Sequence, residues 1–357
     1  MKQEQHEKRI MSLADIHAAT PPNMRDVAAR AGVSLSAVSL VVNGRPGVGP
    51  GKRARVLTAM NELGYVPTGR RVSTTDTKVL GLLMESLSRQ ASSDGFYSRI
   101  IAGIEDAAFQ RGHRLLLHTY RPGIDPISDI RALMGRDVDG LIIANDGDVT
   151  EEVIRQIAAT DIPVVLVESY LEHAIHAVTA DNFTAGMMAT KHLIDLGHRR
   201  ISALPGPSKY SSLRDRLRGH NTALLEHGIA LDHDLQPPHI SGHPKKGYLQ
   251  MRQLLALRER PTAVFAVSDK SALGAMEAIK EAGLRIPEDI SIIGIDDVAE
   301  SGYSVPPLTT YHVPKYHMGE TAVAVLHDLL STVGRAPAKT MLLGHIVVRQ
   351  STHAPLS

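Results

Sequence analysis

The chain has 357 residues, with 39 Lys or Arg against 38 Asp or Glu and no cysteine. This length exceeds one typical hydrophobic core and predicts two or three domains. The missing cysteines exclude a disulfide scaffold and cysteine-ligated zinc, and they are typical of a reducing compartment. No apolar run approaches the roughly 18 residues of a membrane-spanning helix, and the polar start MKQEQHEKRI lacks the apolar centre of a secretory signal. We therefore expect a cytoplasmic protein with no membrane partner.

Residues 24–43 predict two short helices joined by a tight turn. The first runs from about Met24 to Ala31, and Gly32 suits the left-handed residue that ends a helix. Ser34 is placed to cap the second helix, whose inward-pointing residues are Val38, Val41 and Val42. This arrangement is a helix-turn-helix, whose second helix can lie in the major groove of DNA. Residues 1–22 before it, which end in Pro21-Pro22, are expected to form a disordered extension.

The segment GKRARVLTAMNELGYVP predicts a third amphipathic helix that completes a three-helix core. It begins with Lys52, Arg53 and Arg55, although cations at a helix start oppose the helix dipole. Phosphate binding gives them a reason to be there. Residues 23–78 carry nine Lys or Arg and three Asp or Glu, so the remainder of the chain is acidic overall. A basic module on an acidic body favours DNA binding by the module alone, although a solvated basic face is the simpler alternative.

The rest of the chain alternates apolar runs with helical patterns. Eight runs read as strands: 79–84, 114–120, 140–144, 163–168, 177–180, 201–206, 263–268 and 290–295. Continuous apolar strands between helices predict parallel sheets that are covered on both faces. With this many strands, two sheets and a cleft between them are expected. Ligands in such sheets sit beyond the carboxyl ends of the strands, which are followed here by Glu85, Asn145, Glu168, Asp181, Ser268, Asp269 and Asp296.

Motifs for chemistry are missing from this body. The sequence contains neither a GxxxxGK[ST] phosphate loop nor a GxSxG elbow. Glu168 and Asp296 could form an acid–base pair, yet no nearby nucleophile or metal set gives them a reaction. The 18 histidines are scattered, and we expect surface or capping roles for them rather than a metal site. Polar strand ends without a reactive group favour a binding protein, with no enzymatic activity and no cofactor.

Four segments resemble the LacI/GalR family of bacterial transcriptional regulators. They are DVAARAGVSLSAVSLVVNG (26–44, with ELGYVP closing the head), DNFTAGMMATKHLIDLGHRRISALPG (181–206), RLRGHNTALLEHGI (216–229) and SDKSALGAMEAIKEAGLRIPEDISIIGIDDV (268–298, then PPLTTYHVPKYHMG). The resemblance implies an all-α helix-turn-helix DNA-binding head on an α/β core of two doubly wound parallel-sheet lobes, similar to periplasmic sugar-binding proteins. It also implies a homodimer that binds a double-stranded DNA operator. A small-molecule effector, with sugar as the first choice, would control that binding from the cleft.

The resemblance also divides the chain into domains. Residues 23–67 would be the DNA-binding domain, 68–78 the hinge, and 79–357 the ligand-binding and dimerisation core. Lobe 1 would comprise about 79–179 and 314–340, and lobe 2 about 180–313 and 341–353.

Site residues follow from the same resemblance, position by position. Operator contacts would come from Ser34, Leu35, Ser36, Ser39, Asn43, Lys52 and Arg53. In the hinge, Arg70 and Arg71 could enter a narrow minor groove. The cleft would be lined by Phe96, Tyr97, Glu168, Asp181, Tyr210, Ser212, Arg216, Phe265, Ser268 and Asp296, and Asn145 joins them from its strand-end position. Arg216 and Asp296 are the leading candidates, because a polar ligand can partner buried charges; an internal ion pair is the alternative.

The sequence departs from the family pattern in four places, one of which is the loop SLSRQASSDGF, where the family more usually has Asn-Pro before the aromatic pair. Leu40 stands where the family usually has Arg, which removes a DNA contact from the second helix. The stretch TGRRVSTTDTK after Pro67 is a poor helix former, so the usual wedge into the minor groove is not expected. Val313 replaces a polar Gln near the cleft.

Other functions stay open at this stage. A purine or a phosphorylated metabolite could replace the sugar as effector. A solute-binding protein of the periplasmic type and an enzyme of α/β type are the alternatives from other classes.

Overall fold

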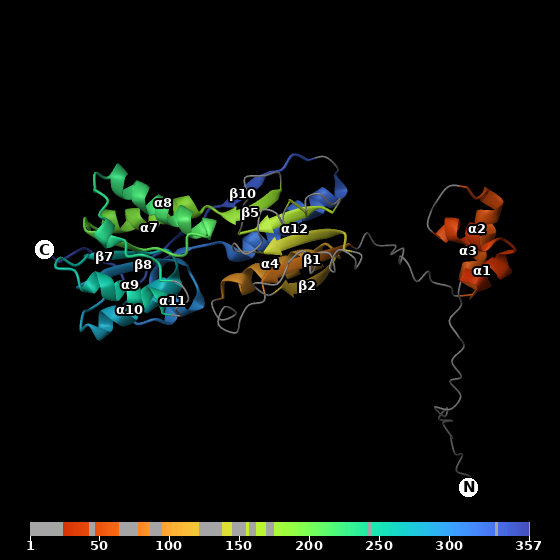
Figure 1. Ribbon diagram of the computed structural model, residues 1–357. Coiled ribbons are helices and arrows are strands. Elements are labelled where there is room, and N and C mark those ends of the chain that lie inside the picture. The colour runs from red at the N-terminus through yellow and green to blue at the C-terminus, as the bar shows by residue number, and fades with distance from the viewer. Residues whose placement is uncertain are drawn as a thin grey trace, which may run out of the picture. The chain divides into compact units, whose positions relative to one another are not determined.

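The chain divides into two compact units, Met1–Thr75 and Asp76–Ser357, which we call the head and the core. The computed structural model describes residues 24–42, 47–63, 78–85, 95–120, 138–144, 155–156, 162–168, 175–240, 245–332 and 335–356. Figure 1 shows the elements of each unit. Of the predicted segments, the N-terminal extension (1–22) and hinge residues 68–77 lie outside the described residues.

Three helices build the head, as the sequence predicts: α1 (Met24–Ala31), α2 (Leu35–Val42) and α3 (Pro50–Leu63). Gly32 ends α1 in the left-handed region, with φ of 62°, a conformation that costs glycine little. The backbone N–H of Ala37 donates to Ser34 Oγ over 3.2 Å, which caps α2. A small apolar core joins the three helices through Val27, Val38, Val41, Val56 and Ala59.

The first sheet of the core has six parallel strands in the order β10-β5-β4-β3-β1-β2. Its strands are β1 (Val79–Glu85), β2 (Arg114–Tyr120), β3 (Gly140–Ala144), β4 (Val164–Val167), β5 (His176–Ala180) and β10 (Lys339–Leu342). Two helices, α4 (Phe96–Gln110) and α12 (Lys315–Ser331), pack against each other, and α12 lies on β3, β4 and β5. Adjacent strand residues alternate between two apolar clusters: Leu82 and Met84 belong to one, Leu83 to the other.

The second sheet has five strands in the order β11-β9-β8-β7-β6. They are β6 (Ile201–Leu204), β7 (Ala263–Ala266), β8 (Ser291–Asp296), β9 (Thr309–His312) and β11 (His345–Val347), of which only β11 is antiparallel to its neighbour. Helices α7 (Asn182–Asp195) and α8 (Ser211–Glu226) lie on one side of this sheet in Figure 1, and α9 (Lys246–Leu255) and α10 (Asp269–Glu281) on the other. The short η1 (His233–Leu235) and α11 (Ala299–Tyr303) complete the described elements.

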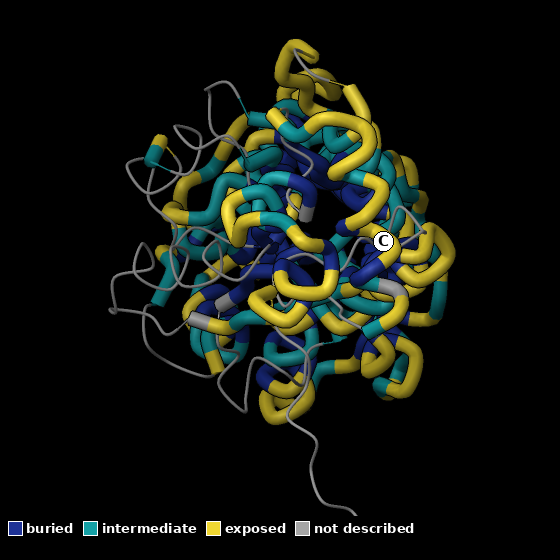
Figure 2. The backbone as a smooth tube through the Cα atoms, turned by 90° about the vertical axis from the view of Figure 1, so that its right-hand side faces the viewer, coloured by how far each residue is buried: buried dark blue, intermediate teal, exposed yellow. Residues whose placement is uncertain are grey.

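Burial on both faces explains the continuous apolar strands. Every residue of β3, β4, β6 and β7 is buried. Figure 2 shows such buried stretches in dark blue, with helical turns in teal and yellow around them. The two parallel sheets predicted from the sequence are therefore present. The eight predicted strands correspond to β1–β8. Strands β9, β10 and β11 were not predicted, because their short sequences TTYH, KTML and HIV form no long continuous apolar run.

In the described part of the core, the chain passes between the sheets three times. It does so between Ala180 and Asn182, between His312 and Lys315, and between Leu342 and His345. Strand β10 stays in register with β5 as far as Leu342 opposite Ala180, so residues 341 and 342 lie in the first sheet rather than beyond it. The crossing segments are held together: Asp181 N donates to Leu342 O over 3.0 Å, and Gly344 N donates to the Tyr311 hydroxyl over 2.6 Å.

Candidate functional site

The start of α2 presents small side chains to solvent on the head. Ser34, Leu35 and Ser36 are exposed, and Leu35 leaves 44% of its surface in water although it is a large apolar residue. Ser39 is half-buried one turn further along α2. An exposed first turn with one apolar tip is the surface that a recognition helix offers to base edges and thymine methyl groups.

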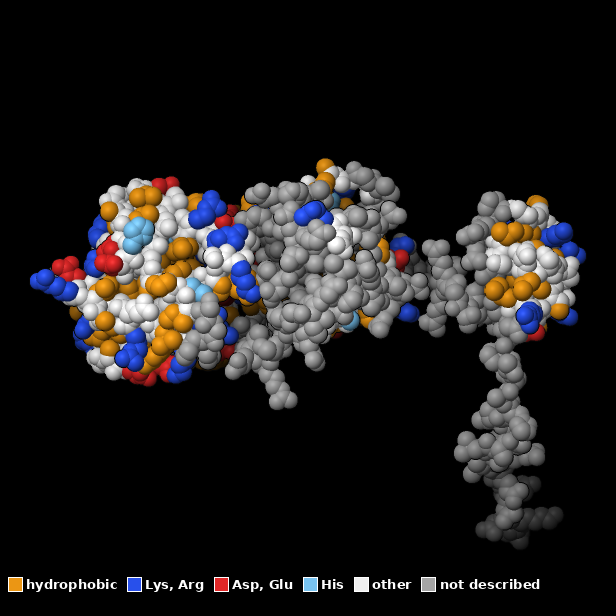
Figure 3. All heavy atoms as spheres, in the orientation of Figure 1, with side chains coloured by type: hydrophobic (Ala, Val, Ile, Leu, Met, Phe, Trp, Pro, Cys, Tyr) orange, Lys and Arg blue, Asp and Glu red, His pale blue; other side chains and the backbone are white. Residues whose placement is uncertain are grey.

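Cations accompany this surface. On α3, Lys52 is exposed and Arg53 is half-buried. Figure 3 shows the Lys and Arg side chains of the head in blue, with little acidic red on the face in view. The ion pair between Arg30 and Glu62, with nitrogen and oxygen 2.7 Å apart, ties α1 to α3 at an exposed position. Asn43, Arg70 and Arg71, the other expected DNA contacts, lie outside the described residues.

In the core, Arg216 of α8 is the centre of a buried polar network. Only 3% of its surface is exposed. Its Nη1 donates to Asp296 Oδ1 and to the carbonyl of Val267, and its Nε donates to Asn182 Oδ1, each over 2.8 Å. Asn182 begins α7, Val267 follows β7, and Asp296 ends β8, so the network stands at the carboxyl ends of the strands. That is where a doubly wound sheet holds its ligand.

Two further carboxylates lie near this network. Glu168, directly after β4 of the first sheet, is buried and accepts from Ala180 N over 3.2 Å. Burial raises the pKa of Glu168 and also that of Asp296, and the Arg216 guanidinium opposes both rises. Asp181 is already used locally, because its carboxylate caps α7 through Thr184 N (3.0 Å) and Thr184 Oγ1 (2.8 Å). The Arg216 guanidinium therefore pairs with a carboxylate of the second sheet, and its charge also acts on a carboxylate that follows a strand of the first.

The remaining expected cleft residues are spread along the helix starts. Ser268 caps α10 by accepting from Ser271 N over 3.3 Å. Tyr210 immediately precedes α8, and Ser212 is buried in its first turn. The half-buried Phe96 and Tyr97 begin α4, with their rings edge to face and their centroids 5.4 Å apart. Asn145 lies outside the described residues.

Phe265 occupies a different setting from these residues. It is fully buried in β7, and its ring stacks on His220 with centroids 4.9 Å apart. The pKa of His220 falls to about 3 because burial disfavours its charged form. His113 and His198 are buried as well, so the expectation that the histidines serve surface or capping roles is wrong for these three. An aromatic partner or a hydroxyl compensates for their burial.

Several residues of the network were not singled out from the sequence. Asn182, Asp297 and Lys315 lie within two residues of predicted positions or of a sheet crossing, but their partners come from distant segments. Asp297 pairs with Arg349, nitrogen to oxygen 2.6 Å, and with His312 at 2.9 Å. Asn182 and Asp297 directly follow the predicted residues Asp181 and Asp296, and this adjacency is the signal that could have pointed to them. Lys315 is adjacent to neither.

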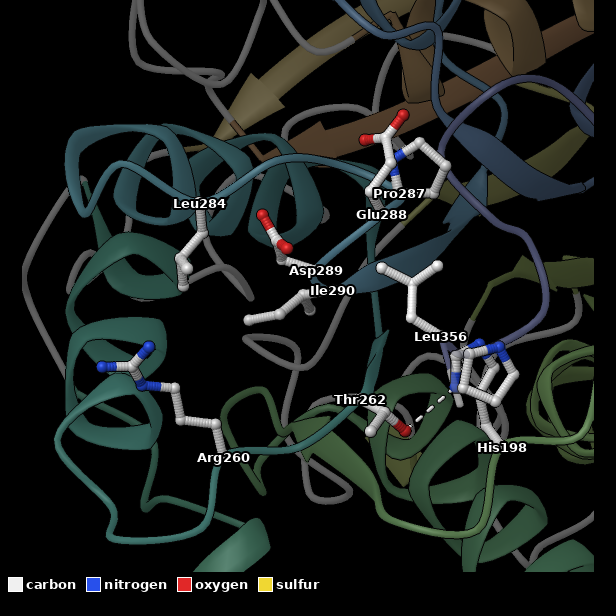
Figure 4. A pocket seen from close by; sticks show the side chains of 10 residues that line it. His198, Arg260, Thr262, Leu284, Pro287, Glu288, Asp289, Ile290 and Leu356 are labelled. Carbon is white, nitrogen blue, oxygen red and sulfur yellow. Dashed lines mark hydrogen bonds between the residues drawn. The ribbon is translucent and has the colours of Figure 1, made fainter.

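A cavity of about 240 Å³ lies elsewhere in the core, at the amino ends of the second sheet's strands (Figure 4). His198, Thr262 and Ile290, which precede β6, β7 and β8, line it together with the C-terminal Pro355 and Leu356. His198 Nδ1 lies 2.9 Å from Thr262 Oγ1 in this wall. No expected cleft residue takes part in this cavity, since those residues stand at the opposite ends of the strands.

Within the described residues, no group of three or more His, Cys, Asp or Glu side chains is placed to hold a metal ion. In that same part of the chain, no helix is both long and apolar enough to cross a membrane.

Comparison with known proteins places this geometry in a family. Residues 23–68 match the family of "Bacterial regulatory proteins, lacI family", and residues 190–352 match the "Periplasmic binding protein-like domain". The HTH-type transcriptional repressor PurR of Photobacterium profundum is 32% identical over 92% of this chain and 98% of its own length. The ribose operon repressor of Haemophilus influenzae is 33% identical over 93% and 98%. The chain belongs to the LacI family.

Solved structures agree with this assignment. A complex of the transcriptional regulator CelR with cellobiose superposes with a TM-score of 0.70 at 31% identity, over 93% of this chain and all of that one. The Lac repressor dimer bound to operator and an anti-inducer gives 0.71 at 29% identity, over 94% and 100%. This LacI-family protein is therefore a DNA-binding transcriptional regulator, with the helical head and the periplasmic-binding-protein-like core that the sequence predicts.

Proposed function

We propose that this LacI-family regulator binds its operator as a homodimer and that a neutral sugar bound around Arg216 controls its affinity for DNA. Two heads that meet half-sites about one helical turn apart must be held at a fixed spacing. A ligand that changes the relative orientation of the lobes alters that spacing. The ligand can shift the equilibrium between the DNA-binding and the non-binding arrangement only by the difference between its affinities for the two, typically about 1–3 kcal/mol. Repressor function is supported by the relatives, which are named as repressors.

The observation that carries the proposal is the buried Arg216 network at the carboxyl ends of the strands. A guanidinium offers only donors and a carboxylate only acceptors, while each sugar hydroxyl can both donate and accept. Arg216, Asp296 and Glu168 can therefore each bind a hydroxyl group. A phosphorylated metabolite fits less well, because Arg216 is already paired with Asp296, and the Lys315 ammonium already donates to main-chain carbonyls.

A purine base is the second candidate effector, favoured by the similarity to PurR. A flat base needs an aromatic face. Phe265 is fully buried against His220, so Phe96 and Tyr97 are the rings that remain near the start of α4. The structure of the network favours the sugar, and hypoxanthine serves as the competing ligand in the test.

Thermal unfolding of the full chain tests the effector class. The ligands are ribose, cellobiose, hypoxanthine and ribose 5-phosphate, because the first two occur in structures of relatives. A ligand at about 100 times its dissociation constant adds about 2.7 kcal/mol of stability. We expect a shift with a neutral sugar and none with the phosphate. Because the proposal involves binding alone, the sugar should be chemically unchanged after incubation with the protein. A shift with hypoxanthine alone would identify the purine as the effector.

Substitution of Arg216 tests the site. Arg216→Lys keeps the charge but loses the forked geometry, and Asp296→Asn removes the opposite charge. Both should abolish the response of DNA binding to the sugar while leaving DNA affinity without sugar nearly unchanged. Arg218→Ala is the matched control, because Arg218 lies on the same helix with an exposed side chain. A normal response in Arg216→Lys and in Asp296→Asn would place the effector elsewhere. The homodimer is tested separately, by light scattering on the protein as it elutes from a size-exclusion column.

A further inference from the structure

The turn that carries Asp296 has an unusual backbone. Asp296 has φ of 127° and Asp297 has φ of 55°. Both values lie in the region that residues with a side chain rarely adopt. Two such residues in succession persist only where surrounding contacts hold them, and such strain gathers at functional sites. The conformation of this turn decides where the Asp296 carboxylate points, and here it points to Arg216.

Lys315 holds this turn through its side-chain ammonium. Its ammonium donates to the main-chain carbonyl of Asp296, to that of Val313 over 3.2 Å and to that of Asp297 over 3.4 Å. Only 5% of Lys315 is exposed. An ammonium has three donors, and three carbonyls take them. Rotation of either peptide unit in the turn would turn a carbonyl away from the ammonium and leave a buried donor without its partner.

Charge supports the same role. Burial lowers the pKa of Lys315, and Asp296, Asp297 and Asp269 oppose that change by favouring the charged form. The ammonium is therefore held among three carboxylates while its hydrogen bonds go to carbonyls. This leaves the Asp296 carboxylate available to the Arg216 side of the site.

Lys315 also joins the two sheets at the site. It is the first residue of α12, which packs on the first sheet, whereas the turn that it binds ends β8 of the second. Its Nζ lies 5.9 Å from the ring centroid of Phe96, at the start of α4. A cation at this distance from an aromatic ring is attracted to its face. One side chain thus contacts the aromatic residue of one lobe and the acidic turn of the other.

We propose that Lys315 is a positioning residue of the effector site. It fixes the backbone of Asp296 and Asp297 so that the Asp296 carboxylate faces Arg216, and it aligns this turn with Phe96. The assignment of the effector site itself rests on the function proposed above, whereas the effect of Lys315 on the turn does not.

The first test needs no effector. Lys315→Met keeps an unbranched chain and removes the donors, and Lys191→Met is the control at an exposed position on α7. Hydrogen exchange is measured on the full chain for the amides of Asp297 and Val298, which donate to Thr310 Oγ1 (3.4 Å) and Asp269 Oδ2 (3.0 Å). We expect exchange about ten-fold faster in Lys315→Met and unchanged in Lys191→Met. Equal exchange in wild type and Lys315→Met would overturn the proposal.

The absence of cysteine from the chain allows a rescue. Lys315→Cys can be alkylated with 2-bromoethylamine while unfolded and then refolded, which restores an amine at the length of lysine. The same treatment of the wild type is the control. We expect slow exchange to return after alkylation. This experiment also decides the matter if Lys315→Met fails to fold. A properly folded, alkylated protein with fast exchange at Val298 would contradict the proposal.

The second test connects the turn to effector binding, with ribose and cellobiose as probes. For a sugar that binds the wild type, we expect Lys315→Met to weaken binding about ten-fold, or about 1.4 kcal/mol. Affinity for DNA without sugar should stay within about two-fold. A merely structural role would lower both affinities together. If neither sugar binds the wild type but amide exchange at Asp297 and Val298 is still faster in Lys315→Met, the sugar assignment fails. The role of Lys315 in positioning the turn then stands.

Discussion

Gly186 of α7 lies directly against the main-chain carbonyl of Arg216 on α8. A Cβ at Gly186 would overlap that oxygen, and a Cβ at Gly219 of α8 would overlap the carbonyl of Phe183 on α7. The two helices therefore cross at a pair of glycines. Arg216 lies one turn before Gly219 on α8, so this close crossing sets the depth at which the guanidinium enters the site.

Gly186→Ala should consequently damage both stability and effector binding. Overpacking of this kind typically costs about 1–3 kcal/mol, and relief by separating the helices would move Arg216 away from Asp296. Urea unfolding and sugar titration measure the two effects. Gly302→Ala is the control, because nothing lies within 4 Å of its added Cβ, and it should be neutral or slightly stabilising. A stability of Gly186→Ala equal to wild type would mean that the helices part without cost.

The sequence predicted the local parts of this arrangement better than the long-range ones. The helices of the head follow from local signals, namely the spacing of their apolar residues, the turn at Gly32 and the cap at Ser34. The strands up to β8 follow from apolar runs. The resemblance to a family supplied Arg216 and Asp296. Lys315 could not be recognised in this way, because its role depends on carbonyls 18 and 19 residues earlier in the chain.

Phe265 shows the same limit for a side chain. Its place in an apolar run predicts burial, but the sequence pattern would be the same if the ring lined the cleft. The partner that decides its environment is His220, which is 45 residues away and itself looked like one of many scattered histidines. Packing between α8 and β7, rather than any local pattern, determines that this ring belongs to the core.

Asp269 should make the stability of the core depend on pH. It is fully buried and accepts from Val298 N, Ser301 Oγ and Thr310 Oγ1. Burial, with Asp296 nearby, raises the pKa of Asp269 from 3.8 to about 6. Between these values the folded state holds a proton that the unfolded chain has released. Stability therefore falls as pH rises from about 4 to 6, by at most about 3 kcal/mol from this group.

Asp269→Asn should remove this contribution. Its amide can still accept from Val298 N while its NH₂ donates to the Thr310 hydroxyl. Urea unfolding between pH 4.5 and 7.5 should show the wild type losing stability relative to the variant as pH rises, with no further change above about pH 7. Asp289→Asn is the control, because Arg285 lowers the pKa of Asp289 to about 2 and its titration ends below this window. A pH-independent difference for Asp269→Asn would show that Asp269 is ionised throughout.

Ser34 should stabilise the second helix of the head through its cap. Ser34→Ala removes the acceptor for Ala37 N, which typically costs about 1 kcal/mol. Amides of α2 in the free, full chain should then exchange about five-fold faster. Ser34→Asp keeps an acceptor and should retain protection. Because the measurement is made without DNA, it separates capping from any contact of Ser34 with an operator. Equal exchange in Ser34→Ala and wild type would show that the cap adds no stability.

Lys52 and Ser36 should affect DNA binding in different ways. An operator selected from a random DNA pool with the wild type and a scrambled version of it are the two probes. Lys52 is exposed at the start of α3, where it can meet phosphate. Lys52→Ala should weaken binding to both DNAs alike and reduce the slope of log affinity against log salt by about one per subunit.

Ser36→Ala should instead change the ratio of the two affinities, because a base contact carries sequence information. Since Lys191 is on α7 of the core, Lys191→Ala should alter neither quantity. An unchanged salt slope in Lys52→Ala would remove α3 from the DNA contact surface, and the exposed first turn of α2 would then have to act with other cations.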